Sequence, residues 1–168
     1  LQCTATAMRS MTKHSMADSA IRPMNRTEFP EVLDLLHRCE LPLDGLADHQ
    51  DLIYVAGRDS TIVGCAALEL YGPYGLLRSV AVDSLSRGHG LGQRLLDTMV
   101  EVAQERSLSN LYLLTETASD YFGQRGFQIV DRSSVPQRVQ QSIEFTRACP
   151  ASALAMRRTL SNDETDHE

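Results

Sequence analysis

The spacing of apolar positions switches between two periods along the chain, and each switch predicts the boundary of an element. Val32, Leu35, Leu36 and Cys39 recur at helical spacing, as do the apolar positions that follow residue 90. Short apolar runs bounded by turn residues predict strands between these helices. Strands are expected at 20–24, 52–57, 62–70, 76–82, 111–115, 127–131 and 153–160, and helices at 46–49, 91–106, 117–125 and 135–143, besides the one that carries Val32.

The composition fits one globular domain and excludes several classes of function. The chain has 168 residues, 42% of them hydrophobic, and a formal net charge of −6, so it can bury a core without a metal or a disulfide. The acidic balance argues against a nucleic-acid partner, and no apolar run approaches the roughly 18 residues that a membrane span needs. The four cysteines are widely spaced, without a C-x-x-C pair, which favours a reducing, cytoplasmic location.

The two ends of the chain lack the periodicity of its middle. We expect residues 1–18 to be disordered or foreign to the natural protein, and residues 161–168 to be a disordered acidic tail. Residues 19–160 are expected to form the domain. The sequence leaves a homodimer open.

The most informative stretch is a glycine-rich turn at residues 86–92, between the apolar run 76–82 and a helix. Glycines let the backbone come close to a ligand, and the free N–H groups at a helix start favour an anion. A phosphate-bearing ligand is therefore expected. The dinucleotide fingerprint fails because Gln93 stands at its sixth position, and no G-K-[ST] follows.

Two motifs resemble those of the GCN5-related N-acetyltransferase (GNAT) superfamily. Residues 87–92, R-x-x-G-x-G, resemble its (Q/R)-x-x-G-x-(G/A) loop, and residues 118–127, A-x-x-x-F-x-x-x-G-F, resemble its A-x-x-x-Y-x-x-x-G-F segment. The order of the predicted elements also resembles the superfamily's order. The resemblance implies an α/β (α+β) acyl-CoA N-acyltransferase fold. Its sheet would be mixed and mostly antiparallel, with six to seven strands, flanked by helices and splayed between strands 4 and 5.

The same resemblance implies acetyl-CoA as the co-substrate and no metal. It places the pantetheine arm against the backbone of Val80, Ala81 and Val82, where one amide can act as the oxyanion donor. Thr115 and Phe122 stand where the superfamily has further cofactor contacts. The pyrophosphate is expected on the turn, at Arg87, Gly88, His89, Gly90, Leu91, Gly92 and Gln93. His89 is interpreted as a solvated spacer rather than as a base.

The motifs leave the acid and the base of the reaction open. Phe122 stands where the superfamily often has a tyrosine, so Tyr121, about 100° around the helix, is the candidate acid. The fourth strand has no carboxylate, and Glu69 at the end of the third strand is therefore the candidate base and a candidate acceptor contact. Glu116 and Glu144 are weaker candidates.

Arg78 interrupts the apolar run of the fourth strand. A two-residue alternation puts it on the same face as Val80 and Val82, and burying an arginine without an anion is costly. We expect it either to bind an anionic acceptor, such as a carboxylate or an arsenic oxyacid, or to pair with Glu69 or Asp83.

A narrower resemblance, to the arsenic-resistance N-acetyltransferase group, rests on residues 76–82, 112–118, and 144–145 with 149–153. It implies a role in detoxifying arsenic compounds. The leading hypothesis is acetyl transfer from acetyl-CoA to the amine of a small acceptor. The alternatives are acetylation of a protein or peptide, and a non-catalytic acyl-CoA or metalloid sensor. Cys149 is interpreted as a packed thiol rather than an arsenic ligand.

Overall fold

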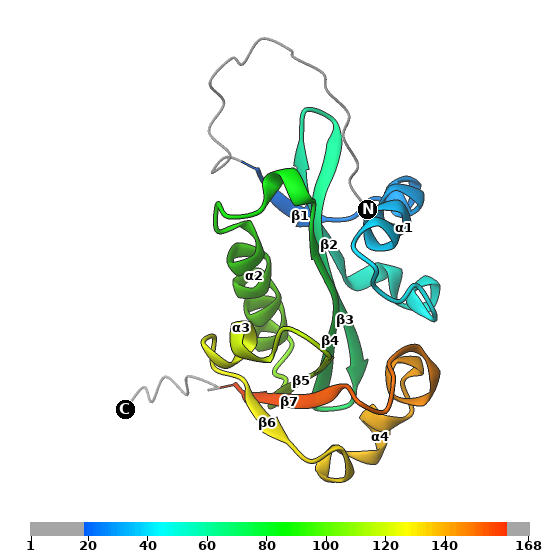
Figure 1. Cartoon of the computed structure of the whole chain (residues 1–168), viewed down its shortest axis with the longest axis vertical. Helices are drawn as coiled ribbons and strands as arrows, with labels where there is room; N and C mark the ends of the chain where they lie inside the picture. Colours follow the sequence, from blue (N-terminus) through cyan, green and yellow to red (C-terminus); the bar gives the residue numbers. More distant parts are fainter. Residues whose placement is uncertain (1–18, 161–168) are drawn as a thin grey trace.

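The computed structural model describes residues 19–160, which form a seven-stranded sheet with helices on both faces (Figure 1). The predictions for residues 1–18 and 161–168 lie outside the described residues. The strands are β1 (Ile21–Pro23), β2 (Ile53–Arg58), β3 (Thr61–Tyr71), β4 (Tyr74–Val82), β5 (Asn110–Thr115), β6 (Gln128–Val130) and β7 (Leu154–Thr159). The helices are α1 (Phe29–Arg38), α2 (Leu91–Glu105), α3 (Ser119–Gly123) and α4 (Gln137–Gln140), with the short turns η2 (Arg26–Glu28), η3 (Leu46–Leu52), η4 (Ser84–Ser86), η5 (Arg132–Ser134) and η6 (Glu144–Ala148).

The expected elements are present, most of them within two residues of their predicted bounds. The helix predicted at 135–143 is the main exception, because α4 stops at Gln140 and the chain continues into the π-helical turn η6. Ser142 explains part of this break: its Oγ accepts a hydrogen bond from the N–H of Glu144 at 3.2 Å. Such a side chain competes with the helical ladder for backbone donors. The break matters because it brings Glu144 toward the sheet.

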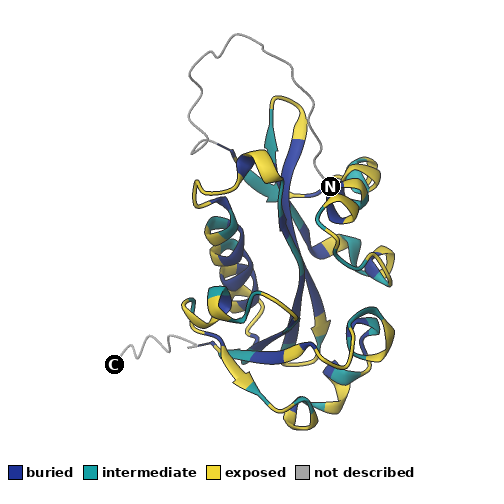
Figure 2. Ribbon diagram, viewed as in Figure 1, coloured by how far each residue is buried: buried dark blue, intermediate teal, exposed yellow. Residues whose placement is uncertain are grey.

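The helices α1 and α2 cover opposite faces of the sheet. The apolar stripe of α2 is buried in the largest cluster of the core, against which Val80 and Val82 of β4 also pack. Val32 of α1 belongs to a second cluster with Ala67 of β3 and Ala81 of β4. Figure 2 shows this layering, with dark inner surfaces and exposed outer faces of the helices. No helix in the described range is both long and apolar enough to cross a membrane.

The strand order is β1-β2-β3-β4-β5-β7-β6, and β4 and β5 are the only parallel neighbours among the described strands. Only the first three residues of β4, Tyr74 to Leu76, pair with β5. Gly75 allows this approach, since a Cβ there would lie 2.9 Å from the side chain of Leu111. Beyond Leu76 the two strands part, while β5 continues to pair with β7. The predicted splay between strands 4 and 5 is therefore confirmed.

A bulge in β4 changes which way its side chains face. Cys65 of β3 pairs with Ala81 and Ala67 pairs with Arg78, so β4 has one more residue than β3 between these two pairs. Ser79 lies in this stretch with a left-handed φ of +57°. The extra residue resets the two-residue alternation. The prediction that Arg78 shares a face with Val80 and Val82 is therefore wrong: Arg78 faces the side of α4 and η3, and the two valines face α2.

Candidate functional site

The open edge of β4, from Ser79 to Val82, forms the first part of the candidate site. The strand is buried where β5 pairs with it, but Ser79, Val80 and Val82 are only half-buried once β5 has parted. Val80 and Val82 direct their side chains toward α2, and Ala81 directs its methyl group to the other face. What remains toward the gap is largely backbone. An extended ligand can add to such an edge as a further strand does.

The glycine-rich turn follows this edge directly. Gly88 and Gly90 have φ values of +82° and +79°, and a Cβ on either would meet no atom within 4 Å. They are glycines because of their backbone conformation and not because of crowding. Arg87 reaches back from the turn, and its Nε donates to the carbonyl oxygen of Val82 at 2.9 Å. The predicted turn residues from Arg87 to Gln93 thus lie together at the start of α2, with Leu91 turned into the core.

Tyr121 of α3 lies against this same turn. A Cβ on Gly92 would come within 2.8 Å of the Tyr121 hydroxyl oxygen, so the glycine leaves room for the phenol. The guanidinium of Arg125 lies over the Tyr121 ring at 3.6 Å from its centroid. Burial raises the pKa of Tyr121 and keeps the phenol protonated. The hydroxyl of the candidate acid is therefore placed at the start of α2.

Two predicted cofactor contacts are occupied by the protein itself. Phe122 is buried, and its ring packs edge-on against Phe127, with centroids 5.7 Å apart. Thr115 uses its Oγ1 to accept the N–H of Ala118 at 3.0 Å, which orders the start of α3. The hydroxyl oxygen of Thr115 therefore serves the backbone at the start of α3.

The second part of the candidate site is a buried group of charged side chains on the face of the sheet that carries α1. Arg78 is 4% exposed, and its Nη1 lies 2.9 Å from Glu69 Oε2. Its Nε lies 2.9 Å from Glu144 Oε1, and its Nη2 donates to the carbonyl oxygen of Pro42 at 3.4 Å. Arg78 therefore joins β4 to β3, to the loop before η3 and to η6. The expected partner Glu69 is found, and the alternative partner Asp83 instead pairs with Arg38 at 2.9 Å.

Glu69 is held by several donors besides Arg78. Ser142 Oγ donates to Glu69 Oε1 at 2.6 Å, Tyr71 donates to the same oxygen, and His49 Nε2 lies 3.6 Å from it. Burial by itself raises the pKa of Glu69, but the hydrogen bonds from Ser142, Tyr71 and Arg78 outweigh it and hold the pKa below its usual range. A buried carboxylate with a lowered pKa is a weak base, and Glu69 fits an orienting role better than proton removal.

Three members of this group were not among the predicted site residues: His49, Tyr71 and Ser142. They come from segments without a recognisable motif, and only the folded chain brings them to Glu69. Glu144 was a weaker candidate for the base, and the structure pairs it with Arg78 and with the thiol of Cys149. Cys149 Sγ donates to Glu144 Oε2 at 2.6 Å.

The cysteines among residues 19–160 are held by hydrogen bonds and burial. Burial and the bond to Glu144 raise the pKa of Cys149 to about 12, so it stays a thiol. Cys39 and Cys65 direct their sulfur atoms to the carbonyl oxygens of Val82 and Ser79. Among residues 19–160 no group of three or more His, Cys, Asp or Glu side chains is placed to hold a metal ion.

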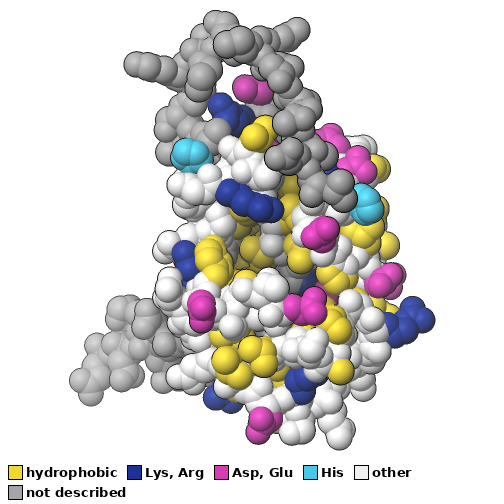
Figure 3. Space-filling view, viewed as in Figure 1, with side chains coloured by type: hydrophobic (Ala, Val, Ile, Leu, Met, Phe, Trp, Pro, Cys, Tyr) yellow, Lys and Arg dark blue, Asp and Glu magenta, His cyan; other side chains and the backbone are white. Residues whose placement is uncertain are grey.

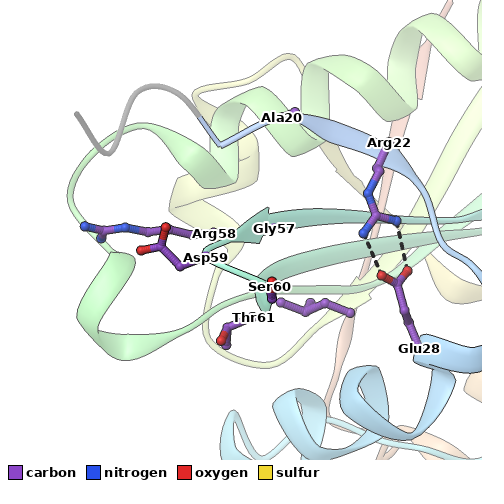
Figure 4. Close-up of a pocket in the computed structure, with 9 residues that line it drawn as sticks. Ala20, Arg22, Glu28, Gly57, Arg58, Asp59, Ser60 and Thr61 are labelled. Carbon is purple, nitrogen blue, oxygen red and sulfur yellow. Dashed lines mark hydrogen bonds and ion pairs between the residues drawn. The ribbon is translucent and has the colours of Figure 1, made fainter. Parts of the chain in front are cut away.

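One face of the molecule is hollowed near its middle (Figure 3). Figure 3 shows apolar side chains gathered around a hollow near the middle of the visible face. A separate pocket of about 420 Å³ lies between β1, η2 and the β2–β3 hairpin, and it contains none of the predicted site residues. Figure 4 shows its Arg22–Glu28 ion pair, 2.6 Å long, on one side and the hairpin residues Arg58 and Asp59 on the other.

Comparison with known proteins assigns the family. The Acetyltransferase (GNAT) family matches residues 14–127, and the chain belongs to this family. An amino-acid acetyltransferase of Mycobacterium tuberculosis (strain ATCC 25618 / H37Rv) is 33% identical over 95 residues, which are 56% of this chain and 51% of that protein. An amino-acid acetyltransferase of Escherichia coli (strain K12) is 31% identical over 99 residues, 58% of this chain and 22% of that protein. The chain thus spans about half of the length of the first relative and about a fifth of the second.

Solved structures share the fold at lower sequence identity. N-acetylglutamate synthase from Neisseria gonorrhoeae, complexed with coenzyme A and N-acetyl-glutamate, matches with a TM-score of 0.75 at 22% identity, over 89% of this chain and 36% of that one. A Mycobacterium tuberculosis protein in complex with CoA and a further ligand matches with a TM-score of 0.73 at 22% identity, over 84% and 99% of the two chains. The acyl-CoA N-acyltransferase fold expected from the sequence is therefore confirmed.

Proposed function

We propose that this chain transfers the acetyl group of acetyl-CoA to the α-amine of an amino acid. The parting of β4 and β5 directly before the glycine-rich turn carries the proposal. It leaves one backbone edge of β4 unpaired, and the turn that can bind an anion follows this edge directly in the chain. The names of the relatives support the acceptor class: the matched proteins of M. tuberculosis and E. coli are amino-acid acetyltransferases.

The open edge fits coenzyme A. Val80 and Val82 are half-buried, and their backbone runs beside the gap. On this edge of β4 no described strand pairs beyond Leu76. The turn from Arg87 to Gly92 would hold the pyrophosphate with its N–H groups and the guanidinium. When bound, acetyl-CoA supplies an activated thioester carbonyl. A backbone N–H next to the bulge at Ser79 would stabilise the negative charge that develops on its oxygen.

The side chains around this edge divide the remaining work. Tyr121 lies at the turn, where its hydroxyl would contact the phosphate groups of the cofactor. Phe122 stays packed in the core against Phe127. Because Phe122 has no proton to give, water or the reacting amine would protonate the leaving thiolate.

Arg78 would act on the acceptor through the surfaces that it holds. Both Glu69 and Glu144 already bind its guanidinium, and a direct contact with an acceptor carboxylate would have to displace one of them. Arg78 lies on β4, the strand that has the open edge. It binds the loop at Pro42 and, through Glu144, the segment from Ser142 to Cys149. These two segments would shape the space for the acceptor.

The test is release of free thiol from acetyl-CoA with a panel of amines. We expect release with α-amino acids, glutamate among them, and an N-acetyl amino acid of matching mass as the product. The same amino acids with the amine already acetylated are the control and should give no release. Absence of thiol release with every amino acid, under conditions where coenzyme A binds, would refute the proposal.

The same panel separates the other readings of the sequence. Release with peptides alone would indicate a protein acetyltransferase, and binding of coenzyme A without release would indicate a sensor. The arsenic-resistance specialisation is a finer hypothesis that rests on the three resembling segments. An arsenic-containing amino acid belongs in the panel, and a clear preference for it over glutamate would support that specialisation.

A further inference from the structure

Acetyl transfer to an amine needs a group that takes a proton from the acceptor, because an ammonium has no lone pair for attack. Glu69 is 1% exposed, and its oxygens are occupied by Arg78, Ser142 and Tyr71. Its carboxylate is therefore enclosed by protein and does not meet an acceptor directly. A second group has to stand between Glu69 and the acceptor.

His49 has the required position. Its Nε2 lies 3.6 Å from Glu69 Oε1, and its side chain is 29% exposed while that of Glu69 is 1% exposed. Within η3, His49 alone has non-helical backbone angles, φ −124° and ψ 26°, so a kink between two short helical turns sets the direction of the imidazole. With Nε2 turned to Glu69, Nδ1 is the ring nitrogen turned away from the carboxylate.

We propose that His49 is the general base of this enzyme, taking the acceptor's proton on Nδ1 while Glu69 orients the ring from Nε2. The inference rests on the proposed function and adds a residue that touches its acceptor. An imidazole is the side chain that ordinarily titrates near neutral pH. A base of that kind, oriented by a buried carboxylate, is an arrangement that proton-transfer enzymes use repeatedly.

Glu69 Oε1 places a carboxylate 3.6 Å from His49 Nε2, within reach of the imidazolium that forms in the step. Two carboxylates, Glu69 and Glu144, meet a single guanidinium, Arg78, so a second cation balances the group. The thiol of Cys149 and the phenol of Tyr71 add no charge, because burial and their hydrogen-bonded carboxylates raise the pKa of each to about 12. Besides His49, the titratable and charged groups that contact Glu69 of β3 or Glu144 of η6 are Tyr71 of β3, Arg78 of β4 and Cys149.

The step balances with these groups. An N–H bond of the acceptor's ammonium breaks, and the proton passes to His49 Nδ1. The freed lone pair forms the C–N bond at the thioester carbonyl, the C–S bond breaks, and its electron pair leaves with the sulfur of coenzyme A. The second proton of the new amide nitrogen reaches the thiolate through water, and His49 returns its proton to solvent.

The experiment compares His49→Gln and His49→Ala with wild type and with His37→Gln, an exposed histidine of α1 as the matched control. Thiol release is followed with one accepted amino acid from about pH 6 to about pH 9. We expect His49→Gln to lower kcat about 100-fold near neutral pH and to keep the KM for acetyl-CoA. The acidic limb of the wild-type profile should disappear. Added imidazole should restore part of the activity of His49→Ala, and His37→Gln should match wild type.

Other outcomes separate this inference from the proposed function. If wild type releases thiol with amino acids and His49→Gln keeps both kcat and the acidic limb, His49 is not the base. If activity falls but the acidic limb persists and imidazole restores nothing, His49 only positions other groups, and the inference is again overturned. If wild type acetylates no amino acid, the proposed function fails and this inference fails with it. Coenzyme A binding to each variant, measured by calorimetry, reports whether it is folded.

Discussion

The two halves of β4 are built by different means. The half from Ser79 to Val82, together with the glycine-rich turn, presents backbone: half-buried residues, left-handed glycines and an open strand edge. The half from Tyr74 to Arg78 is mostly buried. It pairs with β3 along its length and with β5 from Tyr74 to Leu76, and it ends in an arginine between two carboxylates. The bulge at Ser79 is the boundary between them.

The difference fits the proposed function, in which the half from Ser79 to Val82 binds the cofactor (the cofactor half) and the half from Tyr74 to Arg78 serves the acceptor (the acceptor half). A cofactor that is the same for a whole family can be held by main-chain groups, which need only glycines and a strand that ends its pairing. An acceptor that differs between relatives needs side chains. In this protein those side chains come from β3, β4, η3 and the segment around η6, and they depend on one another for burial.

The largest effect is expected from replacing Arg78, whose guanidinium lies between two carboxylates in the acceptor half. Arg78→Met should leave Glu69 and Glu144 buried without their shared guanidinium, with only His49 near Glu69. It should lower the free energy of unfolding by about 3–5 kcal/mol. The matched control is Arg26→Met, whose pair with Asp51 is exposed at the surface and should cost less than about 1 kcal/mol. Denaturant unfolding at neutral pH measures both. Equal losses in the two variants would contradict the contrast between the two halves of β4.

Replacing the carboxylate of Glu69 should have a smaller, pH-dependent effect. Glu69→Gln should cost about 1.5–3 kcal/mol at neutral pH, the range for hydrogen bonds to a charged group. Because the folded state lowers the pKa of Glu69, its contribution is present above the unfolded pKa of about 4.3 and is lost as the pH falls through the lower folded value. The gap between wild type and variant should therefore close below about pH 4. If the difference in unfolding free energy between wild type and Glu69→Gln widened on acidification, the folded state would raise the pKa of Glu69 instead of lowering it.

The cofactor half should respond to backbone conformation instead. Gly90→Ala forces an alanine to a φ of +79°, which should cost about 1–2 kcal/mol. It should also weaken coenzyme A binding about tenfold, equivalent to about 1.4 kcal/mol. Gly123→Ala is the matched control, because Gly123 lies in α3 and a Cβ there meets nothing within 4 Å. That control should be neutral or slightly stabilising, and calorimetric titration with coenzyme A compares the two.

The smallest effect concerns the contact between Gly92 and Tyr121. Gly92→Ala should place a methyl group 2.8 Å from the Tyr121 hydroxyl oxygen, and Tyr121→Phe should relieve that clash. A double-mutant cycle should give a coupling of about 1 kcal/mol. Tyr121→Phe alone should keep most of kcat. A large loss of kcat in that variant would instead restore Tyr121 as the acid.

The same contrast explains what the sequence could predict. The proposed cofactor half lies in one stretch, so the run of apolar residues, the glycines and the start of α2 were sufficient to predict it. The acceptor half was visible only as Arg78, Glu69 and a weak candidate, Glu144. The alternation rule failed at Arg78 because a bulge of one residue leaves no mark in an apolar run. His49 and Ser142 had no pattern of their own, since their role comes entirely from contacts that the fold creates.

The partners of Arg78 become available at different times during synthesis of the chain. Pro42 and Glu69, two of its partners, precede it, whereas Glu144 follows only after β5, α3, β6 and α4 have been made. A ribosome therefore delivers the open edge and the glycine-rich turn well before the second carboxylate of the acceptor half. Until η6 emerges, Arg78 has one carboxylate instead of two, and this side of the molecule closes among the last of the described elements.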